Sequence, residues 1–190
     1  MSDKKRILTP KARLLWAADL FTAKPNDSGK LMFSCTLVFD KEAQKAPEFA
    51  ALLQAYKEVR DETFKKTNNA DPADYRNPFQ KADKKAAKYS GYEEGAIYLN
   101  VKTKFKPQVI GRRKEDLTEE ECYSGCYVRA TLEKPYYYEN KGNKGFSFGL
   151  GNVQKIADGE RLGGGASADD EFDAVDSGGS SGDDLDDLLA

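Results

Sequence analysis

Hydrophobic and polar positions alternate with a period of two in several short stretches of the chain, a pattern typical of β-strands. The clearest case is residues 96–107, AIYLNVKTKFKP. One face of this stretch is apolar and consists of Ile97, Leu99, Val101 and Phe105. The other face mixes an aromatic ring with polar and basic groups: Tyr98, Asn100, Lys102, Lys104 and Lys106. The pattern predicts a strand with one face in the core and one face outward.

Four further stretches predict strands, namely residues 13–21, 30–39, 125–132 and 145–156. In residues 125–132 the alternation directs Tyr127 and Arg129 outward. Residues 136–138 can extend that strand, and ENKGNKG at 139–145 predicts a turn. Three phenylalanines are assigned to the core: Phe33, Phe39 and Phe105. For three other aromatic residues a core position and a stacking platform remain alternatives: Trp16, Phe146 and Phe148.

The period changes to that of a helix in residues 46–66, where Phe49, Leu52 and Tyr56 recur on one side. Residues 68–95 are polar and rich in lysine, and we expect a surface excursion, part loop with a possible short helix. The chain is therefore predicted to be mainly β, with about five strands and one helix inserted between strands 2 and 3. A small closed or nearly closed β-barrel fits this order and removes exposed strand edges.

Charge divides the chain into two parts. The net charge of the 190 residues is −2, but the last 25 residues hold nine acids and no base, so residues 1–165 carry 30 bases against 23 acids. We predict a folded basic domain at 1–165 with a polyanionic partner, and an acidic tail at 166–190. The tail is expected to be disordered because it has too little apolar surface to fold alone. A tail that only aids solubility is the alternative.

The end of the tail, DDLDDLLA, places leucines among acids, as in a short docking peptide. The residues assigned to partner binding are Asp183, Asp184, Leu185, Asp186, Asp187, Leu188 and Leu189. An inert acidic end is the alternative.

The chain lacks the residues that several classes of function require. The chain has no histidine, no phosphate-binding or dinucleotide-binding glycine motif, and only adjacent acids that diverge, so we expect neither an enzyme nor a cofactor. Cys122 and Cys126 have a metal-like spacing, but a third cysteine and no histidine do not make a closed zinc site. No apolar run is long enough for a membrane span, and the N-terminal residues lack a signal peptide. Because the three cysteines form no disulfide framework either, these features together predict a cytoplasmic protein.

Basic and aromatic residues together fit single-stranded nucleic acid, which offers phosphates and exposed base faces. Tyr98 and Tyr127 are predicted to stack on bases. The residues predicted to pair with phosphates are Lys102, Lys104, Lys106, Arg112, Arg113, Arg129, Lys141 and Lys144. Solvated strand faces are the simpler explanation for any one of them. An RNA-binding module of cold-shock type and a protein adaptor acting through the tail remain alternative functions.

The run CYSGCYVRATLEKPYYYENKGNKGFSFGLGNVQKIADGERLGGGASADDEF resembles the C-terminal signature of an OB-fold single-stranded-DNA-binding protein family of tailed bacteriophages and prophages. Residues 123–129, 136–145 and 149–155 match its Tyr-x-Gly-Cys-Tyr-x-Arg strand, its aromatic strand with an Asn-Lys-Gly turn, and its Gly-Leu-x-Asn-Val-Gln-Lys run. Residues 162–164 and 169–172 match its Leu-Gly-Gly and acidic-Phe elements. Gly151 stands where the motif has an asparagine, and segment 68–95 has no counterpart to carry over.

The resemblance implies a five-stranded OB barrel that binds single-stranded DNA without sequence specificity. It also implies a role in phage DNA replication, recombination and repair in the bacterial host. The disordered acidic tail would contact replication proteins such as a polymerase or a helicase.

Overall fold

The computed structural model describes residues 5–67 and 72–163. Its strands are β1 (Ile7–Leu8), β2 (Ala12–Leu15), β3 (Lys24–Pro25), β4 (Leu31–Phe39), β5 (Gln80–Lys81), β6 (Ile97–Thr103), β7 (Val109–Ile110), β8 (Tyr127–Leu132), β9 (Tyr136–Asn140), β10 (Asn143–Ser147) and β11 (Leu150–Ala157). The α-helices are α1 (Pro47–Lys66) and α2 (Asp83–Ala86), and the 3-10 helices are η1 (Ala17–Leu20), η2 (Ala43–Lys45) and η3 (Pro72–Asp74).

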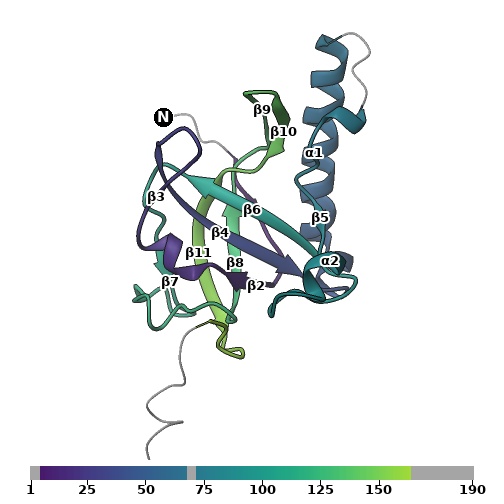
Figure 1. The fold of residues 1–190 in the computed structure, drawn as a ribbon. Coiled ribbons are helices and arrows are strands. Elements are labelled where there is room, and N and C mark those ends of the chain that lie inside the picture. The colour runs from purple at the N-terminus through teal and green to yellow at the C-terminus, as the bar shows by residue number, and fades with distance from the viewer. Residues whose placement is uncertain (1–4, 68–71, 164–190) are drawn as a thin grey trace, which may run out of the picture.

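One strongly curved sheet forms the body of the protein (Figure 1). Within the described ranges it holds nine strands along the order β5-β6-β4-β2-β8-β11-β7, with β1 paired to β8 and β3 paired to β4. The hairpin of β9 and β10 stands apart as a second sheet. An isolated parallel bridge also joins Lys102 on β6 to Gly149, immediately before β11. The mainly β architecture with its inserted helix is confirmed, whereas the sheet differs from a closed five-stranded barrel because it is open and has more strands.

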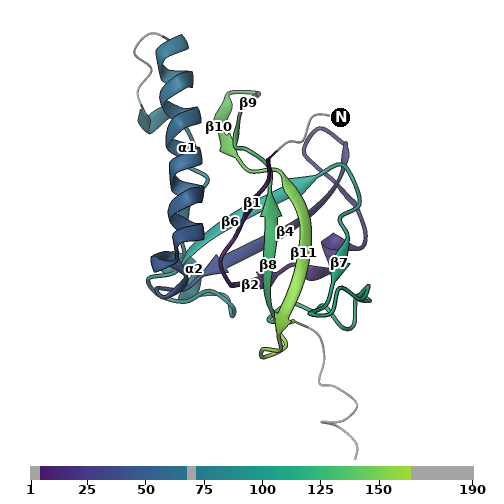
Figure 2. The same ribbon diagram turned by 180° about the vertical axis from the view of Figure 1, so that it is seen from behind.

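Helix α1 matches the predicted helix within one residue. Its first residue is Pro47, which suits the first turn because the N–H that proline lacks would have no intrahelical partner there. Phe49, Leu52 and Tyr56 are buried, as their spacing predicts. The helix stands beside the β9–β10 hairpin and one end of the sheet, as both ribbon views show (Figure 2).

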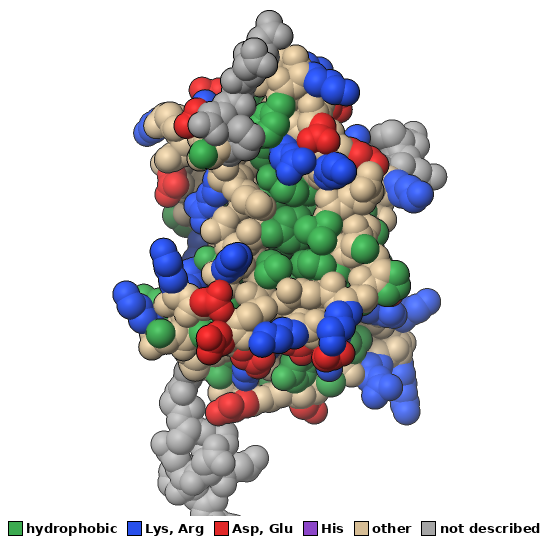
Figure 3. Space-filling model, turned by 90° about the vertical axis from the view of Figure 1, so that its right-hand side faces the viewer, with side chains coloured by type: hydrophobic (Ala, Val, Ile, Leu, Met, Phe, Trp, Pro, Cys, Tyr) green, Lys and Arg blue, Asp and Glu red, His purple; other side chains and the backbone are tan. Residues whose placement is uncertain are grey.

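The outer side of α1 is apolar in part. Pro47, Ala50, Ala51 and Leu53 are exposed, and Leu53 is 43% accessible. Figure 3 shows the side of the molecule on which α1 lies, with apolar side chains gathered in its middle and charges of both signs around them. A polyanion needs continuous positive potential, so this face does not suit a nucleic-acid track.

An aromatic cluster fills the core between α1, the hairpin and the segment after η3. The ring of Phe146 lies 5.5 Å from Tyr56, 5.8 Å from Tyr75 and 5.9 Å from Tyr137, measured between centroids. Phe146 and Phe148 are 2% and 0% exposed, so they are core residues and not stacking platforms. Because the cluster joins three elements that are distant in sequence, it fixes the hairpin against the helix.

Two predictions about strands are wrong. The strand predicted for residues 13–21 ends at Leu15, because Trp16 adopts φ 60° and starts the turn into η1. Such a backbone is strained for a bulky side chain, and Trp16 is 63% exposed. Phe105 is 71% exposed and not in the core, because β6 ends at Thr103 and the alternation stops there. Of the other two predicted core residues, Phe39 is buried and Phe33 half-buried.

The predicted extension of the strand at 125–132 by residues 136–138 is wrong, and the last strand predicted at 145–156 is divided. Tyr136 begins a new strand after Pro135, and β9 turns at Lys141 and Gly142 into β10. Residues Phe148 and Gly149 then separate β10 from β11. The predicted seven-residue turn is thus mostly strand.

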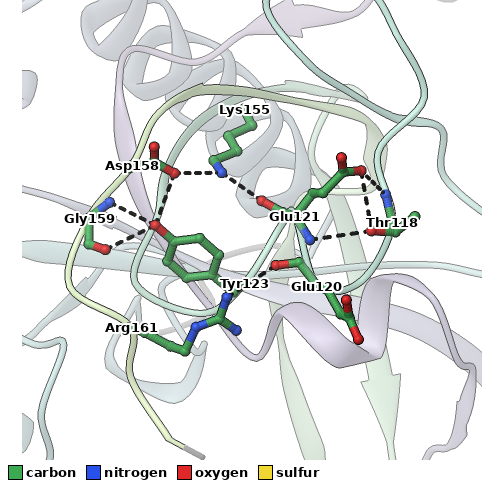
Figure 4. A network of polar contacts seen from close by, with 8 residues as sticks. All are labelled: Thr118, Glu120, Glu121, Tyr123, Lys155, Asp158, Gly159 and Arg161. Carbon is green, nitrogen blue, oxygen red and sulfur yellow. Dashed lines mark hydrogen bonds and ion pairs between the residues drawn. The ribbon is translucent and has the colours of Figure 1, made fainter. Parts of the chain in front are cut away.

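A polar network fixes the place at which the described chain ends (Figure 4). The Tyr123 hydroxyl lies 3.0 Å from Asp158 Oδ1 and from the carbonyl of Gly159. Lys155 Nζ forms an ion pair of 2.7 Å with Asp158, and the Arg161 guanidinium lies 4.2 Å from the Tyr123 ring centre. Residues 158–163 are therefore held at the end of the sheet opposite the β9–β10 hairpin (Figure 1). The acidic tail predicted at residues 166–190 lies outside the described residues.

Cys35, Cys122 and Cys126 are free thiols with at most 2% exposure. Burial raises the pKa of the Cys35 thiol, which stays protonated. Among the residues that the structure describes, no helix has the length and apolar character needed to cross a membrane.

Candidate nucleic-acid interface

A groove lies between the β9–β10 hairpin, the segment after η3 and the outer face of β4 and β6. It contains two cavities of about 180 and 710 Å³. Arg76, Lys102 and Tyr138 line both cavities, so the two form one continuous depression. Its walls combine aromatic rings, cations and uncharged polar groups, which is the mixture that single-stranded nucleic acid requires. Two acids, Asp27 and Asp74, also line the larger cavity.

The hairpin supplies the aromatic wall through the alternation of β9. Tyr137 packs inward on Phe146, whereas Tyr136 and Tyr138 line the larger cavity. Tyr136 is 40% exposed. The Tyr137 hydroxyl donates to Glu139 Oε2 at 2.8 Å, and this bond raises the pKa of Tyr137 to about 12, so the phenol is neutral. Two rings are thus presented to the groove on a hairpin anchored by the third.

The backbone of Arg76 pairs with β10 and so reaches the groove. Its N–H donates to the Lys144 carbonyl at 2.9 Å, and the Phe146 N–H donates to its carbonyl at 3.0 Å. Gly145 makes this approach possible, since a Cβ there would lie 2.7 Å from the Arg76 carbonyl oxygen. The side chain of Arg76 is exposed, and within the described ranges it has no hydrogen-bond or ion-pair partner.

Replacing Gly145 with valine should push the Arg76 segment away from β10. We expect a loss of about 1–3 kcal/mol in the free energy of unfolding, because the added carbons meet backbone and not a movable side chain. Thermal denaturation measures this loss. Asn143→Val is the control, since it places the same side chain at an exposed position of β10. Equal losses in the two variants would contradict the close-approach explanation.

The predicted lysines reach the groove to different degrees. Lys102 lines both cavities, and Lys144 lines the larger one with its Nζ 4.7 Å from the Tyr75 ring centre. Lys141 is exposed at the tip of the hairpin, where φ is 48°. Lys104 and Lys106 are exposed beyond the end of β6, next to the exposed ring of Phe105.

The prediction that Tyr98 faces outward as a stacking ring is wrong. Tyr98 is 6% exposed and packs with Val38, Ala82 and Ala96. The Tyr98 side chain does project from the outer face of β6, as predicted. The segment around α2 packs over it, and Lys85 Nζ lies 4.6 Å from the centre of its ring. The polar excursion therefore covers half of the face that the alternation left open.

Four other predicted residues lie away from the groove. Arg129 is on β8, where its Nε donates to Gln154 Oε1 at 2.7 Å, and the half-buried Tyr127 lies under Lys11. Arg112 and Arg113 follow β7 and line a different cavity, of about 1050 Å³. Strands β7, β8 and β11 form the side of the sheet seen in Figure 2. The residues that the sequence placed on one basic surface are thus divided between two separate surfaces.

Sequence reasoning missed Arg76, Tyr136 and Tyr138 as groove residues. The two tyrosines had a usable signal, since they stand two apart around an apolar-facing Tyr137 in a strand. Arg76 had none, because the segment that carries it has no periodicity. Ser34 and Asn100, on the floor of the groove, follow from the alternation of β4 and β6 once their pairing is known.

Comparison with known proteins supports a nucleic-acid interface at family level. The model of a family described as Enterobacter phage Enc34, ssDNA-binding protein, matches residues 5–187. The chain belongs to this family. A relative from Acyrthosiphon pisum secondary endosymbiont phage 1, protein p50, is 43% identical over 100 residues, which are 51% of this chain and 53% of the relative. The matched part is thus about half the length of that relative.

Two solved structures of phage proteins share the fold of the present chain. The single-stranded DNA-binding protein from bacteriophage Enc34 in complex with ssDNA has a TM-score of 0.65 and 22% identity, over 85% of this chain and 91% of that one. The protein gp2.5, a single-stranded DNA binding protein encoded by bacteriophage T7, has a TM-score of 0.57 and 16% identity, over 95% and 100%.

Proposed function

We propose that this chain binds single-stranded DNA without strong sequence preference and protects it during phage DNA replication, recombination and repair in the bacterial cytoplasm. The observation that carries the proposal is the groove in which Tyr136 and Tyr138 stand beside Arg76 and Lys102. Membership in a family described as ssDNA-binding and the likeness to a protein in complex with ssDNA support it. The proposed function is binding, not catalysis.

An OB-type frame accounts for the position of the groove. The five longer strands of the main sheet, β2, β4, β6, β8 and β11, run in the order β6-β4-β2-β8-β11. The parallel bridge from Lys102 to Gly149 brings the two outer members of this set together. In OB folds the face of the second and third strands carries oligonucleotides, and here that face is the floor of the groove.

The direct test is a titration of oligo-dT of increasing length at several salt concentrations. Affinity should fall with salt with a log–log slope of about −0.7 for each phosphate neutralised. A flat salt response, or no binding to oligo-dT, would overturn the proposal. The same titrations with oligo-U test the RNA alternative, since discrimination between RNA and DNA requires contact with the 2′-hydroxyl.

The acidic tail is proposed to compete with DNA for the groove and to contact replication proteins when displaced. Its 25 residues have a root-mean-square span of roughly 25–30 Å, against a radius of gyration of about 15 Å for the body. Removing residues 166–190 should therefore tighten DNA binding several-fold at low salt, and less at high salt. Unchanged or weaker binding by the truncated chain would contradict competition. A tail of the same length with its nine acids replaced by amides separates charge from bulk.

A further inference from the structure

The smaller cavity of the groove has room for one heterocyclic base. Its volume is about 180 Å³, and it adjoins the larger cavity at Arg76, Lys102 and Tyr138. Besides these residues, its lining is uncharged. Cations position phosphates, whereas neutral amides and hydroxyls discriminate between the edges of bases. The composition of this cavity therefore fits the recognition of a base.

In three amide side chains of the lining, one of the two polar groups, the oxygen or the NH₂, forms a hydrogen bond within the protein and the other does not. Thr36 Oγ1 donates to Asn100 Oδ1 at 2.7 Å, which leaves the Asn100 NH₂. The Phe79 N–H donates to Asn77 Oδ1 at 2.9 Å, which leaves the Asn77 NH₂. The Gln80 NH₂ donates to the Asn77 carbonyl, which leaves the Gln80 side-chain oxygen. Among the described residues, the amides of this cavity thus offer two free NH₂ donors and one free acceptor.

This inventory is complementary to the pairing edge of a pyrimidine. The pairing edge of thymine or uracil presents two carbonyl acceptors and one N–H donor. Cytosine likewise presents two acceptors, O2 and N3, and the N4 amino donor, whereas guanine presents one acceptor and two donors and adenine one of each. Pro78, which is half-buried, adds apolar lining against which a C5-methyl group can pack. The amides therefore match a pyrimidine in both number and type of hydrogen bonds, and the apolar contact for the C5-methyl group favours thymine.

We propose that this cavity, the base pocket, receives one thymine of the bound strand and gives the protein a preference for thymine at one position. The proposal rests on the proposed binding of single-stranded DNA. The other groove residues to which we assign DNA contacts are rings and cations, which tolerate any base. The preference is accordingly modest, about 5- to 10-fold for thymine over adenine, the value of one or two neutral hydrogen bonds.

The test compares the affinities of oligo-dT, oligo-dU, oligo-dC and oligo-dA for the full chain and for Asn100→Asp. This substitution keeps the acceptor for Thr36 and removes the free donor. We expect the three pyrimidine oligonucleotides to bind better than oligo-dA in the wild-type chain, with oligo-dT best, and the dT-to-dA ratio to fall about five-fold in the variant. Lys144→Ala is the matched control, because it should weaken all four oligonucleotides and keep their ratio.

The outcomes separate the two proposals. If the wild-type chain binds none of the oligonucleotides, the proposed function itself fails. If it binds them and Asn100→Asp keeps the dT-to-dA ratio, the preference comes from stacking and backbone flexibility, and the base pocket is overturned. Should Asn100→Asp not fold, as judged by thermal denaturation, Asn77→Asp removes the second donor from an exposed loop. The ratio must then fall in that variant.

Discussion

Replacing Tyr136 and Tyr138 together with alanine should weaken binding of oligo-dT by at least 30-fold. Each stacked base contributes about 1–3 kcal/mol, so losing two rings removes about 2 kcal/mol or more. Both rings line the groove, while the anchoring Tyr137 is retained, so the hairpin should keep its position. Fluorescence anisotropy of a labelled oligonucleotide measures the change.

Two variants control this result. Tyr89→Ala removes a ring that is 61% exposed but does not line the groove, and its affinity should stay within a few-fold of wild type. The pair Tyr136→Phe and Tyr138→Phe keeps both rings and should recover most of the loss. If the alanine pair binds as tightly as Tyr89→Ala, the hairpin does not provide the stacking surface.

Removing three groove cations should have a comparable effect that depends on salt. Each phosphate contact adds about 0.7 to the log–log slope, so Arg76→Ala, Lys102→Ala and Lys144→Ala together should make it shallower by about 2. At 0.1 M salt this corresponds to an affinity about 100-fold lower, because the counterion term extrapolates to zero near 1 M. Titrations at four salt concentrations, followed by isothermal titration calorimetry or by fluorescence anisotropy, give both the slope and the affinity.

The other basic surface supplies a control of equal charge. Arg112→Ala, Arg113→Ala and Arg129→Ala also remove three positive charges, but from the side of β7 and β8. A loss that depended on net charge alone would be equal in the two triple variants. We expect the β7–β8 variant to lose much less affinity. Equal slopes in both would contradict a single groove and favour the continuous surface that the sequence suggested.

Strand alternation predicted the floor of the groove but not which part of it is open. Val38 pairs with Tyr98 on the outer face of β4 and β6, and Ser34 pairs with Lys102 on the same face. The first pair is covered by the segment around α2 and the second lines the groove. Local pattern specifies the side of a strand from which a residue projects. It carries no information on which distant segment will pack over it.

The sequence by itself determined the mainly β composition, the helix at 47–66, the family and the kind of chemistry, because periodicity, charge and motif are local properties. The tertiary structure alone decided which aromatic and basic residues act together. It buried Tyr98, separated Arg129 from Lys102, and brought Arg76 beside Tyr138 through the close contact at Gly145. Proximity across the groove depends on long-range packing of the aromatic cluster and the open sheet, and residues distant along the chain meet only when that packing is complete.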